Sequence, residues 1–398
     1  MLKPVGTGAE LARRIAESIR SRTPVARAFF DANGPAIAAA AGEVAERIRR
    51  GGRLYAFGRG AYATDAQHVA VEFVHPVLVG KPALSASDLS QSFEVSLPVL
   101  LEPADVVVGF GPPEGDPAVA RALNAARARG AYTIGLPSPD ADFCIGAAAQ
   151  DEHIHQEIVE LLGHLLYETV HVFLERRQLT HDAGASAFLY PFLGGDAQAP
   201  TNIIAAVTAS IALKVTEAEE LRERVAAEES GAIAGAVAIL AEEISAGGRL
   251  LLLGNGGSST DATDWAFDCV SPPAGMRPIP ALSLAAESAT ITAIANDVGR
   301  EFIFLRQVIA HVKPHDVVVA LSTSGGSLNV IAALEEARKR GNRTVALLGY
   351  DGGEIQRRGL ADAAIVVRSD YIPRVQEAQA AVYHTMRHAI DWTLQDAG

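Results

Sequence analysis

The stretch that decides the fold is Asp316-Val-Val-Val-Ala-Leu-Ser-Thr-Ser-Gly-Gly-Ser-Leu-Asn-Val-Ile-Ala-Ala333. Val317 to Leu321 is a short apolar run rich in β-branched residues, which is typical of a strand buried on both faces. Hydroxyl side chains and glycines follow, and apolar residues at helical spacing resume at Leu328. Such a strand–loop–helix unit forms an anion site, because the first N–H groups of a helix have no intrahelical acceptor and its dipole is positive there. The loop contains no lysine and no ATP-type P-loop motif.

A second unit of the same kind lies upstream. Leu250 to Leu253 is another apolar run, and it ends in Gly254-Asn-Gly-Gly-Ser-Ser-Thr-Asp261 before the next helical pattern. Ligands of open parallel sheets bind at the carboxyl ends of neighbouring strands. The two loops are therefore predicted to lie side by side at one edge of a sheet.

Composition limits the class of protein. The 398 residues, 49% of them hydrophobic, suffice for two or three compact domains. The net charge of −13 argues against nucleic acid and against an anionic membrane as partners. Cys144 and Cys269 are the only cysteines, which excludes a disulfide scaffold and a cysteine-rich zinc site. We expect a cytoplasmic protein, since no secretory core or membrane-spanning run is present.

The chain contains an internal duplication. The loop glycines Gly58 and Gly254 are separated by 254 − 58 = 196 positions, and each follows an apolar strand pattern. Downstream, the run 105–110 matches 316–321. A repeat of this length predicts two copies of one domain rather than a solenoid.

We place the first copy at residues 1–178 and the second at 202–398. Residues 179–201, rich in Gly, Ala, Asp and Pro, are interpreted as the linker. Within the first copy, residues 11–30 and 36–48 are predicted as two separate amphipathic helices.

The motifs of the second copy resemble those of the sugar isomerase (SIS) family, and within it the phosphoheptose isomerases. The resemblance covers roughly residues 201–392 and rests on Gly254-Asn255-Gly256-Gly257-Ser258, Asn296-Asp297, Ser322-Thr323-Ser324-Gly325 with Ser327, Gly349-x-Asp351-Gly352-Gly353 and Gln376-Glu377. It implies an α/β fold with two SIS-type, flavodoxin-like domains. Each domain would have three αβα layers around a parallel sheet of about five strands.

The resemblance also implies a phosphorylated sugar as the ligand of the second copy. The residues implied in substrate and phosphate binding are Asn255, Gly256, Ser258, Asn296, Asp297, Ser322, Thr323, Ser324 and Ser327, with Glu287 as a contact to sugar hydroxyls. In the first copy the serine loop is replaced by residues 111–116, which include two prolines and two carboxylates. Prolines lack N–H donors and carboxylates repel phosphate, so the first copy is predicted not to bind a phosphosugar in its own loop.

The metal-ligand positions of the family show the opposite pattern. Phosphoheptose isomerases carry a zinc-binding His, Glu, Gln and His, and the first copy has all of these types in His68, Glu72, Gln156 and His164. The second copy has Asp264, Asp268, Gln376 and His384 at the matching positions. The resemblance therefore implies zinc or another divalent ion in either copy, and no nucleotide cofactor.

Three interpretations of the second copy follow. In the first, it is an active ketose–aldose phosphate isomerase, most simply of sedoheptulose 7-phosphate, with His384 and Asp268 exchanging protons through an enediol(ate). In the second, the two copies pair and each contributes residues to a composite site. In the third, catalysis is lost and the chain is a phosphosugar-binding regulator or scaffold. The resemblance also implies a homo-oligomer, a dimer of tandem chains that mimics a tetramer.

Overall fold

The computed structural model describes residues 8–76, 80–175 and 200–396. The chain divides into two compact units, which we call the N-terminal unit (residues 24–217) and the C-terminal unit (residues 1–23 and 218–398). Residues 8–23 thus group with the second copy rather than with the first. The domain limits 1–178 and 202–398 remain predictions, and most of the expected linker, 179–201, lies outside the described residues.

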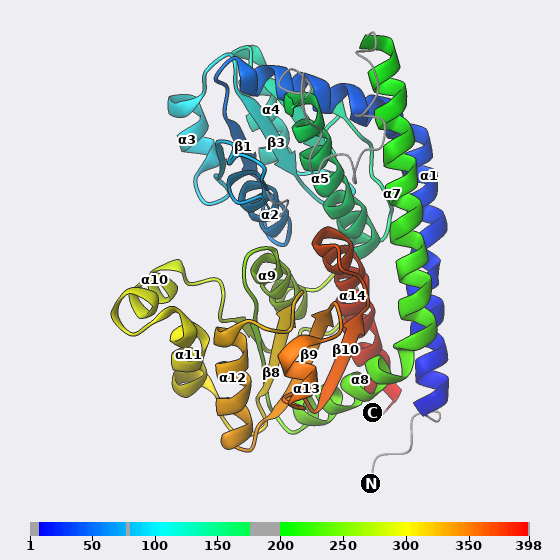
Figure 1. The fold of residues 1–398 in the computed structure, drawn as a ribbon, viewed down its shortest axis with the longest axis vertical. Coiled ribbons are helices and arrows are strands. Elements are labelled where there is room, and N and C mark those ends of the chain that lie inside the picture. Colours follow the sequence, from blue (N-terminus) through cyan, green and yellow to red (C-terminus); the bar gives the residue numbers. More distant parts are fainter. Residues whose placement is uncertain (1–7, 77–79, 176–199, 397–398) are drawn as a thin grey trace. The chain divides into compact units, whose positions relative to one another are not determined.

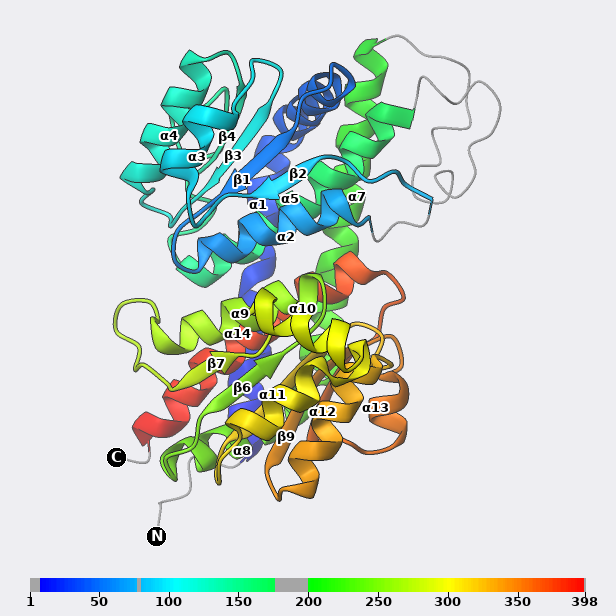
Figure 2. The same ribbon diagram turned by 90° about the vertical axis from the view of Figure 1, so that its left-hand side faces the viewer.

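The N-terminal unit contains a five-stranded parallel sheet with the strand order β2-β1-β3-β4-β5 (Figure 2). Its strands are β1 (Leu54–Phe57), β2 (Ala86–Asp88), β3 (Val106–Phe110), β4 (Tyr132–Leu136) and β5 (Phe143–Cys144). Its helices include α2 (Tyr62–Val74), α3 (Phe93–Leu100), α4 (Pro117–Ala128) and α5 (Glu152–Glu175).

The C-terminal unit repeats this topology with the order β7-β6-β8-β9-β10. Its strands are β6 (Leu250–Leu253), β7 (Ala281–Ser283), β8 (Val317–Ser322), β9 (Arg343–Gly349) and β10 (Ala363–Val367). Its helices include α8 (Ser230–Ser245), α9 (Gly257–Val270), α10 (Ser288–Asp297), α11 (Ile303–His311), α12 (Leu328–Lys339), α13 (Gly353–Arg357) and α14 (Ile372–Asp396), and a 3₁₀ turn, η2 (Arg300–Phe302). Both sheets have the flavodoxin-like order, so the predicted duplication of an α/β fold is confirmed.

Alternate side chains of each central strand enter two different cores. In β6, Leu250 and Leu252 pack with the core that contains Trp265 of α9 and Met386 of α14. Leu251 and Leu253 pack in the core on the other face of the sheet, with residues of α11, α12 and α13. Figure 1 shows α11 and α12 on one side of this sheet and α8 and α14 on the other. Burial on both faces explains why the strands are continuous apolar runs.

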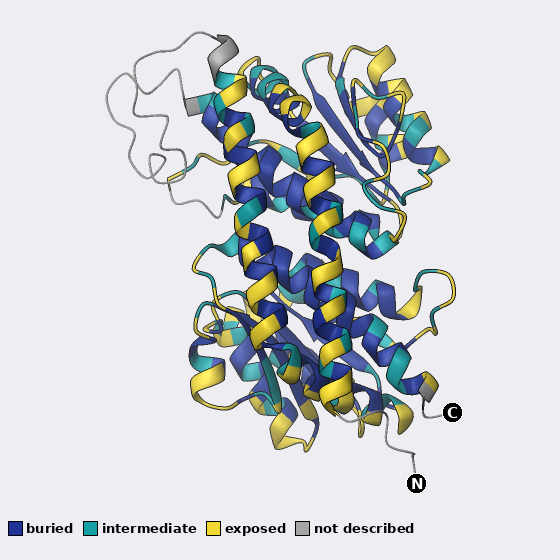
Figure 3. Ribbon diagram, turned by 90° about the vertical axis from the view of Figure 1, so that its right-hand side faces the viewer, coloured by how far each residue is buried: buried dark blue, intermediate teal, exposed yellow. Residues whose placement is uncertain are grey.

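Two long helices contribute to both units. Helix α1 (Gly8–Arg49) is continuous, so the prediction of separate helices at 11–30 and 36–48 is wrong, and both Pro24 and Pro35 lie inside it. Residues at the start of α1 and near the end of α7 (Pro200–Glu228) pack in the core of the C-terminal unit. Exposed residues line the outer faces of both helices (Figure 3). Among the described residues, no helix is long and apolar enough to cross a membrane.

One aspartate fixes the start of the central strands in each unit. In the C-terminal unit, the Asp316 carboxylate accepts backbone hydrogen bonds from Arg249 and Lys313, both at 2.9 Å, and one from the Arg249 guanidinium at 2.7 Å. Asp105 accepts the same two backbone bonds in the N-terminal unit, from Arg53 at 2.8 Å and Glu102 at 2.7 Å. Burial disfavours the charged form of Asp316, but these hydrogen bonds outweigh it and lower the pKa of its carboxyl group.

We expect the substitution Asp316→Asn to lower the free energy of unfolding at pH 7 by about 1–3 kcal/mol, because hydrogen bonds to a buried carboxylate are lost or weakened. Since the pKa of Asp316 is lowered in the folded state, its stabilising contribution is present above the unfolded pKa and is lost as the pH falls through the folded pKa. Thermal unfolding of both proteins from pH 7 to pH 3 should therefore show a difference that shrinks at acid pH. The exposed Asp370→Asn is the control; a difference that is constant with pH would contradict this assignment.

Candidate functional site

The loop between β8 and α12 presents several hydroxyl groups. Ser322 is buried at the end of β8, Ser324 is exposed, and Thr323 is half-buried between them. The N–H of Gly325 donates to Ser322 Oγ at 3.1 Å, and the next amide donates to Ser324 Oγ at 3.2 Å. A hydroxyl oxygen that accepts an amide proton still has its own proton to donate. Ser322 and Ser324 can therefore still donate to a further acceptor.

Gly325 fixes this loop against the start of α13. Its φ of +60° is in the left-handed region, and a Cβ atom built on it would lie 2.1 Å from the carbonyl oxygen of Gly352. The Gly325 carbonyl also accepts a hydrogen bond from the N–H of Ile355 at 3.0 Å. A glycine is required here, because any side chain would both strain the backbone and collide with the neighbouring loop.

The two units differ at the helix that follows this loop. In the N-terminal unit the Asp116 carboxylate caps α4 and accepts from the amides of Ala118 and Val119 at 2.7 and 3.0 Å. Ser327 occupies the equivalent position, 327 − 116 = 211 residues later, and makes no side-chain cap to α12. The chain's own carboxylate thus accepts from the first-turn amides in the N-terminal unit. In the C-terminal unit Ser327 does not, and the Val330 amide donates to Asn329 Oδ1 at 2.9 Å. That the first copy binds no phosphate in this loop stays a prediction.

The loop after β6 is held to α12 by a reciprocal amide pair. Asn255 Nδ2 donates to Asn329 Oδ1 at 3.0 Å, and Asn329 Nδ2 donates back to Asn255 Oδ1 at 2.8 Å. Gly256 caps α9, and Ser258 is buried in its first turn. Asn329 was missing from the sequence-based set, although its place in the first turn after the serine loop marks it as a neighbour of that loop.

The remaining predicted binding residues lie on α10. Glu287 is its exposed N-cap and makes no side-chain capping bond. At the other end of the helix, Asn296 Nδ2 donates to the carboxylate of Asp297 at 2.7 Å. Helix α10 has no buried residue. The role of these three residues in substrate binding stays a prediction.

A histidine lies between two carboxylates in the C-terminal unit. His384 Nε2 on α14 is 3.5 Å from Asp264 Oδ2 and 3.3 Å from Asp268 Oδ2, both on α9, and all three residues are buried. Tyr383, which sequence reasoning missed, donates its hydroxyl to Asp264 at 2.8 Å. Burial and the charge of Asp268 raise the pKa of Asp264. Gln376, the fourth predicted ligand, is buried on the same helix as His384.

The N-terminal unit contains a corresponding cluster with two histidines. His164 Nε2 on α5 is 3.2 Å from His68 Nε2 and 3.5 Å from Glu72 Oε1, both on α2. These residues are buried, and their ligand atoms lie within 4.8 Å of one another. The fourth predicted ligand, Gln156, instead donates its amide to Asp65 at 3.3 Å. Two imidazoles and a carboxylate are a donor set that suits zinc.

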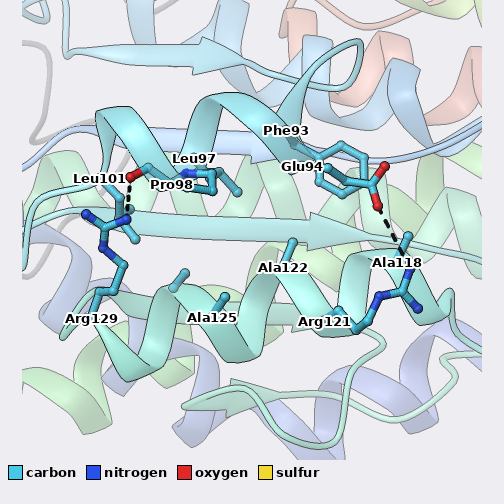
Figure 4. Close-up of a pocket in the computed structure, with 11 residues that line it drawn as sticks. Phe93, Glu94, Leu97, Pro98, Leu101, Ala118, Arg121, Ala122, Ala125 and Arg129 are labelled. Atoms are coloured by element: carbon cyan, nitrogen blue, oxygen red, sulfur yellow. Dashed lines mark hydrogen bonds and ion pairs between the residues drawn. The ribbon is translucent and has the colours of Figure 1, made fainter.

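An apolar groove of about 240 Å³ lies between α3 and α4 (Figure 4). Its floor is formed by Phe93, Leu97 and Leu101 with alanines of α4, and Arg121 and Glu94 lie at its rim. An apolar lining cannot replace the water lost by a phosphate or by sugar hydroxyls. The groove is therefore not a candidate for the sugar-phosphate site.

Comparison with known proteins places the chain in a family. Residues 215–349 match the SIS domain family. A phosphoheptose isomerase of Citrifermentans bemidjiense is 44% identical over 156 residues, which are 39% of this chain and 80% of that protein. A phosphoheptose isomerase of Trichlorobacter lovleyi is 41% identical over 182 residues, which are 46% of this chain and 92% of that protein.

A solved structure resembles the whole chain in fold. The tagatose-6-phosphate ketose/aldose isomerase from Escherichia coli has a TM-score of 0.56 at 16% identity, with 100% of this chain and 98% of that one covered. At this identity the likeness concerns the fold alone, and it extends to both units. Together with the sequence relatives, it leads to one conclusion: the chain belongs to the SIS domain family, and part of it is homologous to phosphoheptose isomerases.

Proposed function

We propose that the C-terminal unit interconverts the ketose and aldose forms of a sugar phosphate, with sedoheptulose 7-phosphate and a heptose 7-phosphate as the favoured pair. The phosphoheptose isomerase relatives support a phosphosugar isomerase. The observation that carries the proposal is the serine loop: it opens a helix that Ser327 leaves uncapped, in the same unit as His384 and its two carboxylates.

The phosphate would bind at the start of α12. Backbone amides and the helix dipole supply positive potential there, and Ser322, Thr323, Ser324 and Ser327 supply hydroxyl donors. The Asn255–Asn329 pair would hold the neighbouring loop in place. This mode of binding requires no lysine or arginine, which fits a chain with a net charge of −13.

His384 would act as the base. Removal of a proton from C1 of the ketose sends the C–H electron pair into a C1–C2 double bond, and the C2 carbonyl becomes the enediolate oxygen. Transfer of the O1 proton to the enediolate oxygen O2, with return of the proton from His384 to C2, gives the aldose and balances the reaction. Asp268, whose Oδ2 is 3.3 Å from His384 Nε2, would orient the imidazole and exchange a proton with it.

Both clusters of the chain fit a divalent metal. The donor set of His68, Glu72 and His164 suits zinc, and that of Asp264, Asp268 and His384, with more oxygen, suits zinc or a harder ion. An ion held by the cluster of the C-terminal unit would polarise the sugar carbonyl when bound. Homo-oligomerisation as a dimer of chains, and a cytoplasmic location, likewise remain predictions.

A phosphosugar-binding regulator is the second candidate. The observation that favours it is the carboxylate at position 268, which is an aspartate where the family resemblance implies a glutamate. The shorter side chain retracts the carboxylate by about 1 Å, a displacement that can cost about 10²-fold in rate when nothing compensates.

The first test replaces His384. We expect His384→Asn to lower kcat at least about 10²-fold while the dissociation constant for the sugar phosphate stays nearly unchanged, because a general base acts on the transition state. Turnover of candidate ketose phosphates and binding by calorimetry measure the two quantities. The exposed His311→Asn is the control. Binding without turnover in the wild-type protein, for every ketose phosphate and with added Zn²⁺, would support the regulator instead.

The second test concerns phosphate binding by the serine loop. Gly325→Ala should abolish sugar-phosphate binding, since its Cβ would lie 2.1 Å from a backbone oxygen. Gly326→Ala in the same loop is the matched control, because the atom nearest to its Cβ would be Ser324 Oγ at 3.8 Å, an ordinary contact. Calorimetric titration and circular dichroism report on binding and folding. Equal binding by the two variants would refute the assignment of this loop.

The third test asks which unit holds metal. We expect wild-type protein reconstituted with zinc and desalted to retain the ion, and His164→Ala to lose the share bound by the N-terminal unit, because an imidazole ligand is removed. Elemental analysis of wild type, His164→Ala and His384→Ala gives the zinc content for each cluster. Unchanged zinc in His164→Ala would mean that the N-terminal cluster is not a metal site.

A further inference from the structure

A polar hollow of about 470 Å³ lies at the amino ends of β8 and β9, the opposite edge of the sheet from the serine loop. Its lining includes Glu243 of α8, residues 312–315 before β8, residues 340–342 before β9, and Arg343 at the start of β9. It lies wholly within the C-terminal unit. None of the residues assigned to the sugar phosphate or to metal lines it, so the proposed function does not explain this hollow.

In the N-terminal unit an arginine occupies the corresponding place. The Arg47 guanidinium donates to the carbonyl oxygens of Pro103 and Gly130 at 2.7 and 2.8 Å. The centre of the guanidinium also lies 5.9 Å from the centroid of the Tyr132 ring. One planar cation therefore joins the loops that precede β3 and β4.

The backbone geometry shows that Glu243 is the structural equivalent of Arg47. A Cβ on Gly52 would lie 2.1 Å from the carbonyl oxygen of Ala104 and 2.9 Å from that of Arg47. A Cβ on Gly248 would lie 1.8 Å from the oxygen of His315 and 2.9 Å from that of Glu243. Asp105 and Asp316 accept the same two backbone hydrogen bonds beside these glycines, which supports the same superposition.

The C-terminal unit joins its loops in another way. Asn342 donates to the carbonyl oxygens of Lys313 and Asp316 at 2.7 and 2.9 Å. Glu243, at the position equivalent to Arg47, lines the hollow together with Pro314 and Gly341, the counterparts of the two residues that accept from Arg47. A Cβ on Gly341 would meet nothing within 4 Å, whereas one on Gly130 would lie 3.3 Å from Pro103.

We propose that this hollow binds the guanidinium group of a small molecule of the arginine class. The guanidinium takes the position that Arg47 holds in the other unit, where Glu243 supplies the charge that arginine prefers as a partner. One carboxylate oxygen of Glu243 accepts a hydrogen bond from His315 Nδ1 at 2.9 Å. The other oxygen can accept from the guanidinium of the ligand. The exposed Lys313 at the rim pairs with the ligand's carboxylate. The other two arginines of the lining already form ion pairs, Arg340 with Glu336 at 2.6 Å and Arg343 with Asp362 at 3.1 Å.

Calorimetric titration of the full-length protein with L-arginine tests the proposal. We expect saturable binding, weaker binding of agmatine, which lacks the carboxylate, and none of citrulline, whose urea group is uncharged. Glu243→Gln should weaken arginine binding at least about tenfold. The exposed neighbour Glu242→Gln, on the same helix, should leave it unchanged.

Glu243→Arg provides an independent readout. The new side chain should fill the hollow as Arg47 does, abolish arginine binding and raise the melting temperature, since its guanidinium gains two carbonyl acceptors. Absence of arginine binding to the wild-type protein, equal binding of citrulline, or unchanged binding in both Glu243 variants would each overturn the proposal.

Discussion

Burial of both faces of each parallel sheet is the constraint on which the rest of the structure depends. Helices on both sides leave no room for polar side chains within the strands, so β6 and β8 are apolar throughout until β8 ends in Ser322. Polar residues are confined to the two edges of the sheet. One edge carries the serine loop and the other carries Asp316 and the hollow beside it. Ligand chemistry can only be placed where the strands end.

The two units show how one backbone supports different electrostatics. At the carboxyl edge, Asp116 in one unit and Ser327 in the other decide whether a helix N-terminus is already neutralised by the chain. At the amino edge, Arg47 and Glu243 reverse the charge at one position. Backbone geometry is kept at the amino edge, as the equivalent bonds of Asp105 and Asp316 show. Divergence after the duplication therefore acted on side chains at strand ends rather than on the fold.

The strands and the duplication were predictable from the sequence because apolar runs and loop glycines are local signals. The helix prediction failed at Pro35, since a proline costs an isolated helix about 3 kcal/mol, and here buried residues such as Ile37 and Val44 stabilise α1 on its far side. The partners within the site were predictable only in part. His384 and Asp268 were predicted from the spacing of the family motif. The Asn255–Asn329 pair and the Tyr383–Asp264 hydrogen bond join segments that are distant in sequence, and no sequence periodicity indicates them.

Helix α1 has a consequence for the history of the chain. Its first turns, with Ile15 and Ile19, complete the core of the C-terminal unit together with Leu221 and Val225 of α7. A protein with only the second repeat would lack the α1 residues that complete its core. A protein with only the first repeat would expose those apolar residues of α1 to solvent. Once α1 had become shared, deletion of either repeat would have left an incomplete core. This explains how the first repeat can be retained although its residues 111–116 differ from the serine loop of the second.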